Sequence, residues 1–260
     1  MLMGEKQRKE HPILFSLMLG IVLTLIVAIA SAVATILESH DRGIMMAQGI
    51  AFLVMAIIIT FYMRKRDASL GIFGFKGMNM SQAKAVLYYV PLLVIVMVQP
   101  IIGGLNTSLS VIDIVIILFF SLLVGYTEES IFRGILRERL RPKGAAFFIV
   151  FSSLFFGILH MANAFNGSGF LHIFLQVVNA LLIGFILALI IEATNSIFPL
   201  ILFHFLFDAL AQLTSNSILE KEVLAVSILN ILYLLYGIYL VYILLKRKRT
   251  AIHATGHISQ

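Results

Sequence analysis

The stretch YTEESIFRGIL, residues 126 to 136, places Glu128, Glu129 and Arg133 directly after a long apolar run, residues 111 to 126. Glu129 and Arg133 are four residues apart, so on a helix they share one face and can form an ion pair. Glu128 is rotated from Glu129 by about 100° on the same helix. The spacing therefore predicts a fixed pair of Glu129 with Arg133 and a separate, reactive carboxylate on Glu128. Taken alone, the stretch also fits a helix end whose charges are solvated.

The composition is that of an integral membrane protein. Hydrophobic residues make up 60% of the 260 residues and charged residues only 12%, and the mean hydropathy of +1.03 lies well outside the range of soluble domains. The chain has no cysteine, which excludes disulfides and thiolate chemistry.

The apolar segments predict the fold class. A membrane-spanning helix needs about 20 apolar residues, and we expect an all-α, polytopic protein of the cell membrane with about eight transmembrane helices. Short loops and the lack of an internal repeat indicate a single membrane domain, residues 1–260. The expected spans are 13 to 36, 44 to 63, 83 to 102, 110 to 131, 145 to 162, 171 to 191, 197 to 213 and 223 to 245.

The distribution of basic residues predicts the orientation. Of the 19 Lys and Arg, 17 lie in the N-terminus, in two alternate loops or in the C-terminal tail, and only Arg42 and Lys221 lie elsewhere. The positive-inside rule then places both termini in the cytoplasm. The pI of 9.6 reflects this topology, and we infer no nucleic-acid partner. Basic residues precede the first span and Ala28-Ile29-Ala30 resembles a signal-peptidase site. At about 24 residues the run is longer than a signal peptide's apolar region, so we expect it to stay uncleaved.

Ionisable residues inside apolar spans are costly, and each is a functional hypothesis. Two further groups stand out: His160 ends the stretch FFGILHMAN, and HFLFD sets His204 and Asp208 four residues apart on one helix face. An isolated histidine is usually a packing residue, but three such groups on separate helices suggest one common site. The complete set is Asp113, Glu128, Glu129, Arg133, His160, His172, Glu192, His204 and Asp208, with the amides Gln176 and Asn179.

The expected depths of these groups do not match well. At 1.5 Å per residue, Glu128 lies roughly 13 Å before Arg137, whereas His160 lies about 25 Å beyond Lys143. The two can meet only if the fifth helix is tilted or begins below the membrane surface. We expect Glu128, His160 and His204 to surround one cavity that opens to the cytoplasmic half of the membrane.

Three motifs in this order resemble the CPBP intramembrane proteases, also called the CAAX protease and bacteriocin-processing or Abi family. The family motifs EExxxR, FxxxH and HxxxN or HxxxD correspond to Glu128 through Arg133, Phe156 through His160, and His204 through Asp208. The resemblance implies a catalytic core, residues 110–213, that cleaves a peptide bond within or beside the membrane.

The roles of the motif residues follow from the same resemblance. Glu128 and His160 would activate water, and His204 with Asp208 would stabilise the oxyanion. Many members have Asn at the last position, and Asp208 can replace it as a hydrogen-bond donor only when protonated.

The chemistry of the residues is consistent with amide hydrolysis, which needs a general base and donors for the oxyanion. We expect a mechanism without a cofactor. The alternative is Zn²⁺ held by Glu128, His160 and His204, although the chain has no H-E-x-x-H helix. There is no G-x-S-x-G for a serine nucleophile and no cysteine. Asp113 and Asp208 lack the G-x-G-D context of a paired-aspartate enzyme.

Two other functions compete with this one. A non-hydrolytic membrane scaffold or bacteriocin-immunity protein of the same fold would bind another membrane protein, but such proteins are expected to lose a motif residue. A transporter would explain buried charges, yet no inverted repeat is evident. The predicted partners are a membrane peptide or protein substrate and the lipid bilayer.

Overall fold

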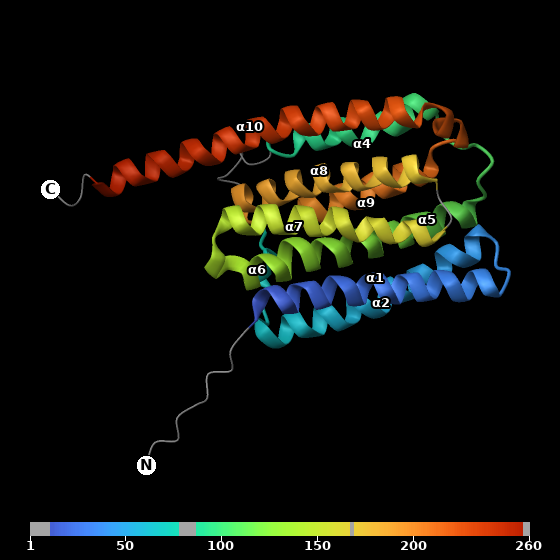
Figure 1. Cartoon of the computed structure of the whole chain (residues 1–260), viewed down its shortest axis with the longest axis horizontal. Coiled ribbons are helices and arrows are strands. Elements are labelled where there is room, and N and C mark those ends of the chain that lie inside the picture. The colour runs from blue at the N-terminus through green and yellow to red at the C-terminus, as the bar shows by residue number, and fades with distance from the viewer. Residues whose placement is uncertain (1–10, 78–86, 167–168, 257–260) are drawn as a thin grey trace, which may run out of the picture.

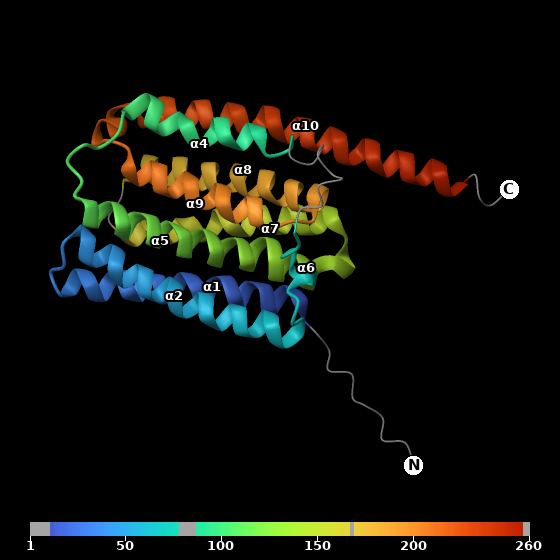
Figure 2. The same cartoon turned by 180° about the vertical axis from the view of Figure 1, so that it is seen from behind.

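The computed structural model describes residues 11–77, 87–166 and 169–256, which form a bundle of helices that run roughly along one direction (Figure 1). Figure 2 shows the bundle from behind. The described residues contain no strand beyond an isolated bridge between Leu105 and Thr214, so the all-α prediction is confirmed for this part of the chain. Residues 83–86 of the expected third span, and the basic residues Lys6, Arg8, Lys9 and Lys84, lie outside the described residues.

The longer helices coincide with the apolar segments. They are α1 (Pro12–Ile36), α2 (Asp41–Arg66), α5 (Val111–Glu129), α7 (Ala145–Leu159), α8 (Phe170–Thr194) and α10 (Glu222–Gly256). Shorter α-helices are α4 (Val90–Gly103), α6 (Leu136–Leu140) and α9 (Phe198–Leu213). The remaining turns are 3-10 helices η1 (Gly71–Phe73), η4 (Arg141–Lys143), η5 (His160–Asn166) and η6 (Asn216–Lys221), and one π-helix, η3 (Ser130–Ile135).

Among the described residues, six helical segments are long and apolar enough to cross a membrane. The chain is therefore a multi-pass membrane protein. Apolar side chains such as Ile29, Phe61 and Ile238 are more than 60% exposed on the bundle surface, where lipid is their natural solvent. Helices α4 and α9, with 14 and 16 residues, coincide with the other two expected spans but are shorter. The total of eight spans and the cytoplasmic location of the termini stay predictions.

One end of the bundle, which we call the basic end, gathers several arginine contacts. Arg66 at the end of α2 pairs with Glu138 of α6 at 2.9 Å. Arg137 of α6 pairs with Glu192 near the end of α8. Arg247 of α10 donates to the carbonyl of Ala193 at 2.8 Å. The end of α2, α6, the end of α8 and this part of α10 therefore lie together.

The opposite end, which we call the turn end, carries the α1–α2 turn and the connections into α5 and α10 (Figure 1). Arg42 at the start of α2 pairs with Asp113 at the start of α5 at 2.7 Å. The backbone N–H of Asn106 donates to the carbonyl of Leu213, the last residue of α9. The start of α5 and the end of α9 consequently face the same side as the α1–α2 turn.

The helix that carries the glutamates is longer than expected. Instead of ending at residue 131, helical structure continues from Val111 to Lys143, over 33 residues. Arg137, which the sequence suggested lies beyond the end of the span, is instead part of this helical segment, and its side chain is 20% exposed and paired to α8.

A glycine turn then folds the chain back. Gly144 has a φ of +89°, a conformation that suits glycine, and α7 starts at the next residue. Glu128 stands 16 residues before Gly144 and His160 stands 16 residues after it, so each lies about 24 Å from the turn. The hairpin brings both to one depth, which removes the mismatch expected from the sequence.

Helices α5 and α9 pack at very short range where the motifs meet. A Cβ at Gly125 would lie 2.9 Å from the backbone nitrogen of Phe205 and 3.2 Å from the carbonyl of Ile201. Only a residue without a side chain allows this approach. Because Gly125 is one turn before Glu128 and Glu129, the contact sets these glutamates against His204 on α9.

Candidate active site

Glu129 and Arg133 form the ion pair that their spacing predicted. The guanidinium Nη1 of Arg133 donates to Oε1 of Glu129 at 2.9 Å, and both side chains are 0% exposed. A buried pair of this kind keeps both groups charged only while both partners remain. The pair is thus a fixed part of the site and is closed to solvent.

Arg133 is held from three further directions. Its Nη2 donates to the carbonyl of Gly184 on α8 at 3.2 Å. Its guanidinium lies over the ring of Phe156, 4.6 Å from the centroid, and near Phe132, which adds cation–π attraction. Arg133 lies within the π-helix η3, and such turns occur often at functional sites. The role of Phe156 beneath the arginine was not foreseen from the FxxxH motif.

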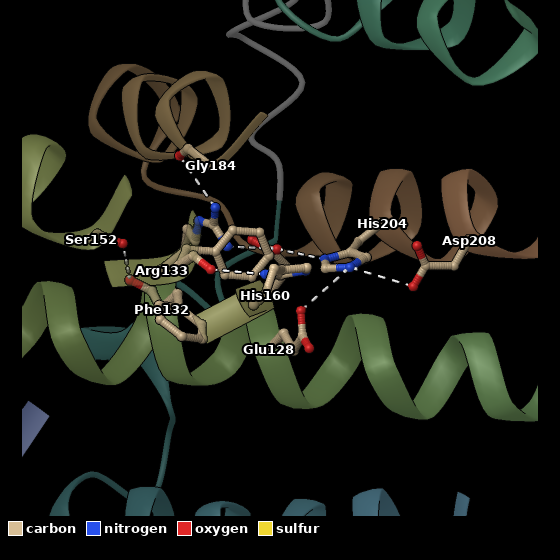
Figure 3. Close-up of polar contacts among 10 residues, drawn as sticks. Glu128, Phe132, Arg133, Ser152, His160, Gly184, His204 and Asp208 are labelled. Atoms are coloured by element: carbon tan, nitrogen blue, oxygen red, sulfur yellow. Dashed lines mark hydrogen bonds and ion pairs between the residues drawn. The ribbon is translucent and has the colours of Figure 1, made fainter. Parts of the chain in front are cut away.

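His204 stands among three carboxyl groups (Figure 3). Its Nδ1 is 2.8 Å from Oε1 of Glu129, so the ring and Arg133 share that oxygen. Its Nε2 is 3.6 Å from Glu128 and 3.5 Å from Asp208. With Nδ1–H donating to the carboxylate of Glu129, Nε2 is the nitrogen that faces the reactive side. Glu129 therefore links the arginine to the histidine, while Glu128 stays on the other face.

His160 is oriented by its own helix. Its Nδ1 lies 2.8 Å from the carbonyl of Phe156, and this carbonyl can only accept, so Nδ1 carries the hydrogen. In the neutral imidazole, Nε2 then keeps its lone pair and can accept a proton. The ring of Phe156 packs edge-on against His160 at 4.8 Å and lies 6.2 Å from the ring of His204. Phe156 thus fixes the spacing between the two histidines.

These side chains converge on one cavity of about 380 Å³. Glu128, His160, His204 and Asp208 all line it, as expected from their placement on separate helices. A smaller cavity of about 120 Å³ touches His160, His204 and Asp208 from the α8 side. The carboxylate of Glu128 is 15% exposed, so water can reach it, in contrast to Glu129.

Most of the cavity lies on the turn-end side of Glu128. On α5 its walls run from Glu128 back through Val124 to Phe120, and on α9 they run from His204 forward to Gln212. Toward the basic end, Phe132 and Phe156 line it. The expected opening to the cytoplasmic half of the membrane stays a prediction.

Sequence reasoning missed two walls of the cavity. Residues of α1 from Leu23 to Ser31 and Gln48 with Phe52 of α2 line it, although both helices precede the expected core, residues 110–213. These residues are apolar or neutral, so no charge inside a span marked them. Gln48 was the one visible signal, as an amide within an apolar run.

The other ionisable residues of the apolar segments have partners away from the cavity. Asp113 forms a capping box with Ser110 and pairs with Arg42, and Glu192 pairs with Arg137 at the basic end. His172 is hydrogen-bonded to Glu222 at the turn end. The amide of Gln176 lines both cavities, and Asn179 lines the smaller one.

The zinc alternative stays a prediction. Within residues 11–77, 87–166 and 169–256, no three His, Cys, Asp or Glu side chains are placed to hold a metal ion. The candidate ligands Glu128, His160 and His204 all line the cavity. Nδ1 of each histidine is used in a hydrogen bond to the protein, so Nε2 is the nitrogen that could bind a metal.

The comparison with known families identifies the segment that holds the motifs. Residues 110–210 match the family model described as "Type II CAAX prenyl endopeptidase Rce1-like". The resemblance to the CPBP proteases is thereby confirmed. No curated protein and no solved structure matches the chain.

Proposed function

We propose that this chain, whose residues 110–210 match the Rce1-like family model, is an intramembrane endopeptidase that hydrolyses a peptide bond of a membrane-associated peptide or protein. The observation that carries the proposal is the convergence of Glu128, His160, His204 and Asp208 on one cavity within a membrane bundle. A scaffold or immunity protein has no need for an acid, two imidazoles and a second acid around one space.

In the proposed mechanism, Glu128 takes up the proton of a water molecule, and His160 accepts a hydrogen bond that helps to orient this water. The water oxygen attacks the carbonyl carbon of the peptide bond and forms a tetrahedral oxyanion. The C–N bond then breaks, the electron pair stays with nitrogen, and the proton passes from Glu128 to the leaving amine. Water thus supplies the hydroxyl of the new carboxyl group and one hydrogen of the new amine.

His204 and Asp208 serve the oxyanion in this proposal. An imidazole whose Nδ1 donates to Glu129 can, when charged, donate from Nε2 to the developing negative charge. Asp208 contributes a donor only in its protonated form. Glu129 and Arg133 would not touch the substrate, and their role is to hold His204 in place.

The test is the substitution Glu128→Gln in purified protein reconstituted with a panel of labelled membrane peptides. Glutamine keeps the volume and a carbonyl acceptor but takes no proton from water, so cleavage should fall by a factor of about 10² to 10⁴. The matched control is Glu220→Gln, the same change at an exposed glutamate of η6, which should cleave as the wild type does.

Two results would contradict the proposal. If the wild type cleaves no peptide of the panel, or if Glu128→Gln keeps full activity, a binding function takes its place. A chelator added to the wild type decides between the two mechanisms. We expect unchanged activity, and its loss would assign Glu128, His160 and His204 to a metal.

A further inference from the structure

Three walls of the larger cavity carry a glutamine side chain that hydrogen bonds hold in place. Gln48 on α2 donates from Nε2 to the hydroxyl of Ser31 on α1 at 2.7 Å. Gln212 on α9 donates from Nε2 to the hydroxyl of Ser121 on α5 at 3.1 Å. Both glutamines line the cavity on the turn-end side of Glu128. In each case the bond joins neighbouring helices and holds the amide in one orientation.

The fixed amides leave half of their hydrogen-bonding capacity for a ligand. Within the part of the chain that the structure describes, the bonds of Gln48 and Gln212 run through Nε2, and each Oε1 remains an acceptor. Gln176 on α8 is fixed the other way, since its Oε1 accepts from Asn163 at 3.0 Å. Its Nε2 is therefore a donor. The three amides offer two acceptors and one donor, and none of them carries a charge.

The dimensions of the cavity indicate the size of its occupant. Phe120 and Glu128 on α5, like His204 and Gln212 on α9, are eight residues apart, which corresponds to about 12 Å along a helix. An extended chain advances about 3.3 Å per residue. The cavity therefore has the length of about four residues in an extended conformation.

An extended peptide within a bilayer requires such partners. A helix satisfies its own backbone groups, but an unwound segment exposes N–H and C=O groups that hydrocarbon cannot satisfy. Each such group costs several kcal/mol in an apolar medium. Amide side chains offer both donors and acceptors, and so match a peptide main chain of any sequence.

We propose that the cavity binds an unwound, uncharged segment of about four residues from a membrane-spanning peptide. The acceptors of Gln48 and Gln212 and the donor of Gln176 pair with its main chain, and it enters from the turn end. The inference rests on the proposed endopeptidase function and names the substrate class and the positioning residues of the same site.

The test measures binding apart from cleavage. The probe is a fluorescent 20-residue Leu/Ala peptide with a central Gly-Ala-Ser-Gly segment and terminal lysines, and the protein carries Glu128→Gln to prevent turnover. Ester analogues replace one central amide at a time and so remove one N–H. An ester opposite Gln48 or Gln212 should weaken binding about fivefold, as expected for one hydrogen bond.

The decisive result is the coupling between protein and peptide changes. The substitutions Gln48→Leu and Gln212→Leu are each added to the Glu128→Gln protein. Each should weaken binding of the amide peptide about fivefold. Each should also make one particular ester peptide bind as well as the amide peptide does. The control Gln99→Leu, on α4 and away from the cavity lining, should change neither. The same peptide with an unbroken Leu centre should bind more weakly.

Three outcomes would overturn the inference. The first is that ester and amide peptides bind with equal affinity, and the second is that each ester weakens binding by the same factor in Gln48→Leu, Gln212→Leu and Gln99→Leu. The third is that the peptide with the unbroken Leu centre binds more tightly. In the first case, the kinetics of Gln48→Leu and Gln212→Leu in the protein that keeps Glu128 test another role. If the amides hold water molecules that lead to the site, only kcat falls and KM stays unchanged. Peptides that bind with this coupling but are never cleaved by the wild type would refute the proposed function while leaving the binding site intact.

Discussion

At the scale of single residues, the two adjacent glutamates have different surroundings although they are chemically identical. The division between Glu128 and Glu129 could be predicted, because helix geometry alone separates neighbouring side chains by about 100°. The hydrogen bond between Glu129 and His204 could not be predicted, because the two residues are 75 positions apart in the sequence and meet only through the packing of α5 against α9. The contact of Phe156 with Arg133 could not be predicted either, since a sequence does not show which ring lies beneath a guanidinium.

The buried pair leads to a prediction about stability. Arg133→Ala leaves the carboxylate of Glu129 uncompensated at 0% exposure, and we expect a loss of about 3 to 5 kcal/mol in the free energy of unfolding. The control Arg42→Ala breaks the pair with Asp113, where the arginine is 48% exposed, and should lower the unfolding temperature far less, because exposed ion pairs contribute little to stability. Thermal unfolding in detergent micelles compares the two variants.

A result in which both variants unfold at the same temperature would mean that the Glu129–Arg133 pair is hydrated. The double variant Glu129→Gln, Arg133→Met sharpens this test. It removes both charges together, and should be more stable than Arg133→Ala.

At the scale of helices, the positions of the apolar segments were readable from composition, while the end of the motif helix was not. The helix passes residue 131 and carries Arg137 to Glu192 on α8, and pairing of this kind is invisible to a hydropathy count. The turn at Gly144 then sets Glu128 and His160 level. The sequence analysis did not identify this turn or show that its two arms have equal length.

Close contact between α5 and α9 leads to a second prediction. In Gly125→Ala the new Cβ would lie 2.9 Å from the backbone nitrogen of Phe205 and 3.2 Å from the carbonyl oxygen of Ile201 on α9, so the helices must separate and the contact between Glu129 and His204 should lengthen. We expect cleavage to fall at least tenfold and the protein to unfold at a lower temperature.

Gly49 on α2 provides the matched control. A Cβ there would be 3.7 Å from Phe120, an ordinary contact, and replacing glycine by alanine inside a helix adds up to about 1 kcal/mol of stability. Gly49→Ala should therefore be active and at least as stable as the wild type. Equal activity of the two alanine variants would show that α9 moves aside without loss of the site.

At the scale of the whole molecule, the class of protein followed from composition, and the direction of the cavity did not. Charges reveal the basic end, but the walls of the cavity are formed by α1 and α2 with residues such as Val27 and Phe52. These resemble any lipid-facing side chain in the sequence. Only the packed bundle shows which of them face inward.

The absence of cysteine from the chain allows a direct test of orientation. We expect an impermeant maleimide to label Glu220→Cys, an exposed position at the turn end, in intact cells. Lys143→Cys, exposed beside the hairpin turn, should be labelled only after the membrane is made permeable. The cysteine-free wild type is the control, and the reverse pattern would place the basic end outside the cell.

The π-helix at Ser130–Ile135, which overlaps the EExxxR motif, holds one residue more than a regular α-helix of the same length would. Deleting one residue there would remove this extra residue and leave the downstream phase intact, whereas deleting one from the regular helix before it, such as Leu122, would rotate everything downstream by about 100°. Arg137 would then leave Glu192, and the hairpin would present a different face to α8. A deletion that keeps every letter of the three motifs should thus inactivate the protein, because the count of residues between them carries as much information as their identity.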